Sequence, residues 1–295
     1  MYSIEDLRTA LSEPEIFGRE LNRIYHHKRA GNDINPNGID IMAQDWDNLI
    51  LLDACRYDIF RDLNPFSGEL RAVESRGSAT VEFLKGNFRN QEFTDTVYAS
   101  ANPQYYKHRE EINCSFHAEI EVWNQHDWHP EWGTILPETM NKDVLETVEQ
   151  YPNKRLIAHY LQPHRPFIGE TAKSHPLLGV EFNRLGTPET DSETYLNAYQ
   201  ETLSWTFKEL SDMLNELPGK TVITSDHGHL ISERGSPIPI SGQFHWRGNH
   251  VDKLLTVPWL ELPVEERRDI FDGDSYKRDS PKEDVSDRLK DLGYM

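Results

Sequence analysis

The chain has 295 residues, 37% of them hydrophobic and 11% aromatic, which suffices for one large α/β domain or two small ones with a sizeable core. Its 50 acidic and 31 basic residues leave a net charge of -19. Such a surface repels phosphate backbones and anionic membranes, so we expect no nucleic-acid partner. The acidic, Lys-poor composition suits either a halophile's protein, because salt screens self-repulsion, or an ordinary acidic cytoplasmic protein.

The sequence indicates neither a disulfide framework nor a membrane protein. The two cysteines, Cys55 and Cys114, are too few for such a framework and lack zinc-finger spacing. The first residues are polar and acidic, unlike a signal peptide, and no apolar run has the length of a membrane span. We therefore expect a cytoplasmic protein without a membrane span.

The chain begins with a predicted helical segment, residues 1–45, ahead of the main domain. Residues 3–30 carry apolar side chains at helical spacing, and Ser3 with Asp6 resembles a capping box. The amphipathic pattern predicts one helix whose apolar face packs against the rest of the protein.

The predicted α/β domain, residues 46–262, starts with a continuous apolar run, Asn48–Asp53, which is typical of a strand covered on both faces. The run ends in Asp53 and leads into a helix, so this carboxylate is either a helix cap or a ligand at a strand's carboxyl end. Further along, Ser78 and Thr80 lie beside a glycine in a turn that opens a helix. A hydroxyl there is either a helix cap or a nucleophile whose pKa a metal lowers.

The middle of the chain alternates strands with helices. Residues 94–136 are aromatic-rich and poorly periodic, so we interpret them as an insertion or lid over the sheet. Residues 154–159 form a second predicted strand, and His164 follows between two prolines that restrict its backbone. A long helix over 194–217 leads to a third strand at 221–224. This alternation predicts a mostly parallel sheet with helices on both faces.

Directly after the third strand comes the stretch Ser-Asp-His-Gly-His, residues 225–229. Asp226 and His227 are suited to hold a divalent cation, and ligands of open α/β sheets gather at this end of the strands. The alternative is a polar turn with a helix cap at Asp226. The local pattern leaves both open.

The end of the chain is less regular. A polar loop at residues 242–250 contains two histidines and precedes a predicted edge strand at 254–260, since Pro258 cannot complete a hydrogen-bond ladder. The tail, residues 263–295, is strongly charged and has a weak helical pattern near 285–292.

Taken in order, these motifs resemble the alkaline phosphatase superfamily, especially its sulfatase-like and phosphoethanolamine-transferase-like branches. Asn48–Asp58 is similar to the first strand and metal-binding acid, and Ser225–Gly228 looks like the Ser-Asp-His-Gly signature. Pro163–Pro166 resembles the mid-chain His-x-Pro element, and Gly248–His250 ahead of Val257 resembles the final histidine and strand. The resemblance implies a three-layer α/β/α fold and a metal-dependent hydrolase or transferase of phosphate or sulfate esters.

The same resemblance implies roles for single residues. Asp53, Asp226 and His227 would hold one metal, while His164 and His250 would hold a second metal or contact the substrate's anionic group. The resemblance to the transferase turn assigns the nucleophile that carries a covalent intermediate to Thr80, with Ser78 as second choice. For substrate binding we expect Arg56, Arg76, His229 and His245.

Three departures from the family pattern limit these expectations. Neither cysteine lies in the motif of sulfatases that use a modified cysteine. The aspartate that two-zinc members carry four residues before the mid-chain histidine is Tyr160 here, so one firmly bound metal is expected and a second site stays open. His229 stands where an acidic residue is often found, as a further ligand or an exposed side chain. Zinc is the expected metal, with manganese or calcium as alternatives.

Two rival interpretations of the sequence are also considered. Cys55 and Arg61 have cysteine-phosphatase spacing, but no glycine lies between them to build a phosphate-binding loop. The second rival is a non-catalytic binding module whose metal site has degenerated. Under the enzyme interpretation the partner is a phosphate or sulfate ester of a small molecule, a glycan or a lipid headgroup. The substrate and the oligomeric state are left open.

Overall fold

A computed structural model describes residues 17–18, 21–22, 24–26, 28, 34–175, 178 and 190–274. The described residues between 17 and 28 are helical, while most of the predicted helix 3–30 and the pattern at 285–292 lie outside the described residues. The elements are β1 (Asn48–Asp53), α3 (Tyr57–Leu63), β2 (Glu69–Glu74), α4 (Thr80–Phe88), β3 (Glu92–Ser100), α5 (Gln104–Lys107), α6 (Arg109–Ile112), β4 (Ser115–Glu121), α7 (Val122–Gln125), α8 (Pro137–Gln150), β5 (Arg155–Pro163), α9 (Glu170–Ser174), α10 (Ser192–Leu214), β6 (Thr221–Ser225), α11 (Asp252–Leu255) and β7 (Thr256–Glu261).

A seven-stranded sheet in the order β2-β7-β6-β1-β5-β3-β4 is the centre of the fold. Strands β4, β3, β5, β1 and β6 run parallel to one another, and β7 pairs antiparallel with both β6 and β2. The predicted fold class, a mostly parallel sheet inside an α/β domain, is confirmed.

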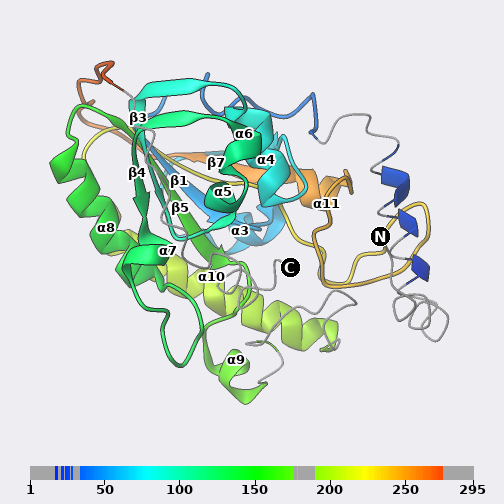
Figure 1. The fold of residues 1–295 in the computed structure, drawn as a ribbon. Coiled ribbons are helices and arrows are strands. Elements are labelled where there is room, and N and C mark those ends of the chain that lie inside the picture. The colour runs from blue at the N-terminus through cyan, green and yellow to red at the C-terminus, as the bar shows by residue number, and fades with distance from the viewer. Residues whose placement is uncertain are drawn as a thin grey trace.

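Helices cover both faces of the sheet, as Figure 1 shows. Alternate residues of β1 face opposite ways, because side-chain direction alternates along a strand. Ile50 and Leu52 pack with α8 and α10, and Leu49 and Leu51 pack with α4. The continuous apolar run of β1 follows from this burial on two faces.

The prediction that residues 94–136 form an insertion or lid over the sheet is wrong for the two strands within this range. Strand β3 pairs with β5 on one side and β4 on the other, so residues 92–100 and 115–121 are part of the sheet and not a lid over it. The aromatic side chains of this region, such as Tyr98 and Phe116, are buried and stack against each other. Aromatics therefore fill the core here, which hid the period of two that marks a strand.

The predicted edge strand at 254–260 is also wrong in its position. Residues 252–255 form α11, and β7 lies between β2 and β6. Pro258 is tolerated because the pairing of β6 with β7 covers only Trp259 to Glu261 and does not reach Pro258. The edge of the sheet is β2, whose side chains are largely exposed and which no sequence pattern indicated.

The start of the predicted charged tail packs against the domain. Arg267 binds the carboxylates of Asp45 and Asp47, and Arg268 donates to the Asp47 carbonyl at 2.8 Å. The segment therefore packs against the residues just before β1, at the amino ends of the parallel strands. The motifs lie at the opposite, carboxyl ends of these strands. No helix of the described residues is long and apolar enough to cross a bilayer. The domain boundaries themselves stay predictions.

Candidate metal centre

Two neighbouring parallel strands bring the first candidate ligands together. Leu52 at the end of β1 lies opposite Ser225 at the end of β6, so Asp53 and Asp226 leave the sheet side by side. Asp53, Asp226 and His227 are completely buried, and their ligand atoms lie within 4.8 Å of one another. This is the carboxyl end of the strands, where α/β folds bind ligands.

Hydrogen bonds and close packing hold Asp226 in place. Its Oδ1 accepts from the amides of Ala54 at 3.0 Å and His227 at 2.8 Å. A Cβ on Gly228 would collide with the carbonyl of Lys253, so glycine is needed here because another backbone segment lies against it.

The orientation of His227 fits a metal ligand. Its Nδ1 lies 2.7 Å from the Gly228 carbonyl, which can only accept, so Nδ1 carries the proton and Nε2 presents a lone pair. That Nε2 lies 3.6 Å from Asp53 Oδ1 and 3.4 Å from Asp226 Oδ2. A backbone carbonyl that fixes the second nitrogen is a common feature of metal-bound histidine.

The donor set fits a divalent cation. Within the described part of the chain Asp226 Oδ2 has no hydrogen-bond partner, although it is buried. Buried carboxylate oxygens are normally paired, because desolvation is costly. Two carboxylates and one imidazole match zinc or manganese, and calcium would need more oxygen ligands.

Thr80 and Ser78 lie differently with respect to this cluster. Thr80 is the first residue of α4, and its Oγ1 lies 3.4 Å from His227 Nε2. Ser78 Oγ lies 2.8 Å from the buried carboxylate of Glu82 and 3.0 Å from the carbonyl of Trp246. The structure therefore places the Thr80 hydroxyl beside the candidate ligands and occupies the Ser78 hydroxyl elsewhere.

Three further histidines gather around His227. The His245 ring stacks on His227 with 4.6 Å between centroids, and its centroid lies 4.9 Å from that of His164. His245 Nδ1 lies 3.1 Å from His229 Nδ1. Burial lowers the pKa of His164 to about 4 and the pKa values of His229 and His245 well below the ordinary value, so these rings are neutral at pH 7.

The structure brings His245, rather than His250, next to His164. His250 is half-buried and its Nε2 lies 3.6 Å from Glu82 Oε2. The family resemblance implied His250, together with His164, as a ligand of a second metal or a contact of the substrate's anionic group. The roles of both histidines stay predictions.

The two arginines expected at the substrate are engaged in ion pairs. Arg56 binds Asp58 with a shortest distance of 2.6 Å and Glu233 at 2.7 Å. Arg76 donates to the carbonyl of Gly86 at 2.7 Å and lies near Asp40. Their contribution to substrate binding stays a prediction, and the contacts described here join each arginine to other groups of the protein.

Cys55 does not have the environment of a catalytic thiol. It is completely buried, and burial raises the pKa of its thiol far above the ordinary value. A cysteine nucleophile needs the opposite shift, toward the thiolate. The cysteine-phosphatase interpretation therefore has no support in this site.

The sequence did not point to two residues behind the ligands. Asn102 follows β3 and donates to Asp53 Oδ2 at 2.7 Å. His159, on β5, lies with its Nε2 3.9 Å from Asp226 Oδ2. The signal for His159 was its position at the end of a predicted buried strand, the same signal that marked Asp53. Asn102 was hidden by the interpretation of its region as a lid.

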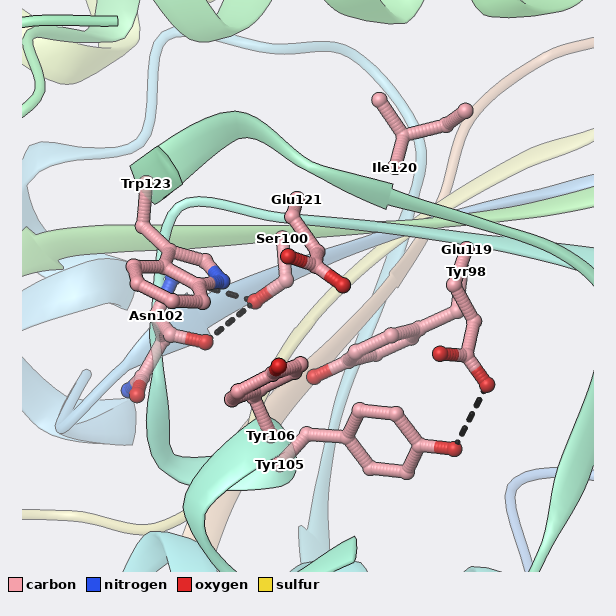
Figure 2. Close-up of a pocket in the computed structure, with 9 residues that line it drawn as sticks. All are labelled: Tyr98, Ser100, Asn102, Tyr105, Tyr106, Glu119, Ile120, Glu121 and Trp123. Carbon is pink, nitrogen blue, oxygen red and sulfur yellow. Dashed lines mark hydrogen bonds between the residues drawn. The ribbon is translucent and has the colours of Figure 1, made fainter. Parts of the chain in front are cut away.

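Figure 2 shows a small pocket whose wall includes Asn102. Tyr98 and Asn102, which contact His159 and Asp53, belong to its wall. The lining consists of Tyr98, Ser100, Asn102, Tyr105, Tyr106, Glu119, Ile120, Glu121 and Trp123.

No family model and no curated protein matches the chain. Solved structures do match. The C-terminal periplasmic domain of EcEptC from Escherichia coli, in complex with Zn, is 13% identical, with a TM-score of 0.47 over 79% of this chain and 77% of that one. The soluble domain of lipooligosaccharide phosphoethanolamine transferase A from Neisseria meningitidis is 11% identical, with a TM-score of 0.45 over 73% and 75%.

A third match is a protein in the alkaline phosphatase superfamily from Vibrio parahaemolyticus, 12% identical, with a TM-score of 0.42 over 80% of this chain and 64% of that one. At these identities the similarity concerns the fold and not the substrate. One of these matches carries the name of the superfamily that the motifs resemble.

Proposed function

We propose that the protein is a metal-dependent enzyme that hydrolyses or transfers phosphate or sulfate esters through a covalent intermediate on Thr80. One observation carries the proposal. The Thr80 hydroxyl lies 3.4 Å from His227 Nε2, the same nitrogen that faces the carboxylates of Asp53 and Asp226. A nucleophile and a cation site are thereby adjacent in a buried environment.

The cation would lower the pKa of the Thr80 hydroxyl and offset negative charge on the phosphoryl or sulfuryl oxygens. Thr80 Oγ1 then forms a bond to phosphorus or sulfur while the bond to the ester oxygen breaks, and the alcohol leaves with a proton. In the second half of the reaction, water or an acceptor alcohol attacks the phosphorus or sulfur atom, the bond to Thr80 Oγ1 breaks, and the Thr80 hydroxyl regains its proton. The acceptor decides between hydrolysis and transfer.

Two features support the binding of an anionic ester. Thr80 is the first residue of a nine-residue helix, and the start of a helix favours negative charge. The neutral ring of His245 stacks on His227, where a ring N–H can donate to an ester oxygen. His164 Nδ1 donates to the Arg165 carbonyl at 2.6 Å, so its Nε2 presents a lone pair that can bind a second cation. As substrates we propose phosphate or sulfate esters of small molecules, glycans or lipid headgroups.

The test compares Thr80→Ala with Thr80→Ser in metal content and in turnover of phosphate and sulfate esters. We expect both variants to retain stoichiometric metal, because neither change removes a carboxylate or imidazole ligand. Thr80→Ala should lose turnover and Thr80→Ser should keep part of it, since serine supplies a hydroxyl at the same place. An unchanged rate in Thr80→Ala contradicts the assignment. A wild-type protein without stoichiometric metal supports the non-catalytic module instead.

A further inference from the structure

His159 is a completely buried histidine that the mechanism does not use. It lies on β5 between Tyr98 and Asp226. Its Nδ1 lies 2.7 Å from the Tyr98 hydroxyl, and its Nε2 lies 3.9 Å from Asp226 Oδ2. Among the described residues neither His159 Nε2 nor Asp226 Oδ2 has a hydrogen-bond partner. Two buried polar atoms thus face each other across 3.9 Å.

The contacts decide which nitrogen of His159 carries the proton. If Nδ1 donated to Tyr98, the lone pair of Nε2 would face the lone pairs of the Asp226 carboxylate, which is repulsive. If the Tyr98 hydroxyl donates to Nδ1, the proton sits on Nε2 and points toward the carboxylate. Burial raises the pKa of Tyr98 and lowers that of His159 to about 4, so both groups are neutral and this tautomer is available.

His227 approaches the same carboxylate oxygen with the opposite tautomer. Its Nδ1 donates to the Gly228 carbonyl, so its Nε2 carries no proton and directs a lone pair toward Asp226 Oδ2, which lies 3.4 Å away. One oxygen of Asp226 therefore lies between a histidine lone pair and a histidine N–H. The first is the form that binds a cation, and the second is the form that orients a ligand.

We propose that His159 is a positioning residue of the metal centre, in which the Tyr98 hydroxyl fixes the ring and Nε2–H orients the Asp226 carboxylate. The proposal rests on the metal centre under the proposed function. The 3.9 Å separation is about 1 Å longer than a direct hydrogen bond, so the proposed contact requires the two side chains to approach by that amount when a cation is bound. Outer partners of this kind typically contribute about 10- to 100-fold to metal affinity.

The experiment measures the affinity of the full chain for Zn²⁺ and Mn²⁺ by competition with a chromophoric chelator, and records the absorption spectrum of the Co²⁺ form. We expect His159→Ala to bind each metal about 10- to 100-fold more weakly. His159→Gln should restore much of the affinity, because the Gln amide places an N–H near the position of Nε2. The metal affinity of Tyr98→Phe should lie between those of His159→Ala and His159→Gln, and its Co²⁺ absorption spectrum should differ from that of the wild type.

Tyr160→Phe is the matched control. Tyr160 is the next residue on β5, equally buried, and its hydroxyl donates to Asn141 at 2.7 Å on the other face of the sheet. Its loss should lower the stability of the protein and leave the metal affinity and the Co²⁺ spectrum unchanged.

Several results overturn the proposal. His159→Ala with wild-type affinity does so, as does His159→Gln binding no tighter than His159→Ala. If His159→Ala fails to fold, Tyr98→Phe decides, and wild-type affinity in that variant overturns the proposal. If the wild-type protein binds no metal, both this inference and the proposed metal centre are overturned. If the wild type binds metal and the His159 variants bind it equally well, only this inference is overturned.

Discussion

Replacement of Asp226 by asparagine should remove the metal while leaving the metal-free fold intact. The two oxygens of Asp226 have separate tasks. Oδ1 accepts from the amides of Ala54 and His227, and the amide oxygen of asparagine can accept both bonds. Oδ2 faces the His227 Nε2 lone pair at 3.4 Å, where the asparagine NH₂ can donate.

The magnitudes follow from these contacts. The metal-free variant keeps two hydrogen bonds. The bond that its NH₂ can donate to His227 Nε2 is offset by the loss of the oxygen that His159 Nε2–H faces, so its free energy of unfolding should stay within about 1 kcal/mol of the wild type. Removal of a charged ligand should weaken metal binding by more than about 100-fold, or about 2.7 kcal/mol, because even outer partners contribute up to about 100-fold.

The assays are urea denaturation of the metal-free protein, metal titration against a chelator, and turnover of p-nitrophenyl phosphate. Asp143→Asn is the matched control, since Asp143 is a buried aspartate on α8, outside the candidate site, and pairs with His126. It should leave metal affinity and turnover unchanged. Asp226→Asn with wild-type affinity or turnover would refute the ligand role, and a metal-free variant that is unfolded would refute the hydrogen-bond reasoning.

Two further predictions use the surroundings of the site. Ser78→Ala should keep turnover and lose about 1 kcal/mol of stability, because its hydroxyl serves a buried carboxylate; a loss of turnover with metal retained would move the nucleophile from Thr80 to Ser78. Burial alone raises the pKa of Asp58, but Arg56 and Lys253 outweigh it and hold the pKa below the ordinary value. The stabilisation is therefore present above about pH 4 and lost as the pH falls, so the stability gap between wild type and Asp58→Asn should narrow in urea titrations from pH 7 to pH 3; a constant gap would contradict the ion pair.

Several elements could be predicted because the signal was local. The apolar run of β1 is a strand that ends where predicted, since burial on both faces favours continuous apolar residues, and β6 ends one residue beyond the predicted strand at 221–224. The start of α4 was also predicted from its turn, and it carries Thr80. Asp53, Asp226 and His227 follow these elements directly, so their approach to one another needed only the rule that parallel strands end at one edge.

Other elements were missed because the deciding information was not local. The pattern of β3 mixes buried aromatics with polar residues, and only its pairing with β4 and β5 makes it a central strand. The side chains of β2 are largely exposed, so the strand had no apolar signal at all. The position of β7 inside the sheet depends on β2, which the sequence did not reveal.

By itself, the sequence determined the candidate ligand types and the strand ends from which they project, because both follow from adjacent residues. Only the tertiary structure decided which distant side chains meet them. His245 reaches His227 and His164 whereas His250 turns to Glu82, although both lie in one loop. The physical reason is that a loop's path is set by the surface it packs against, and no spacing along the chain encodes that surface.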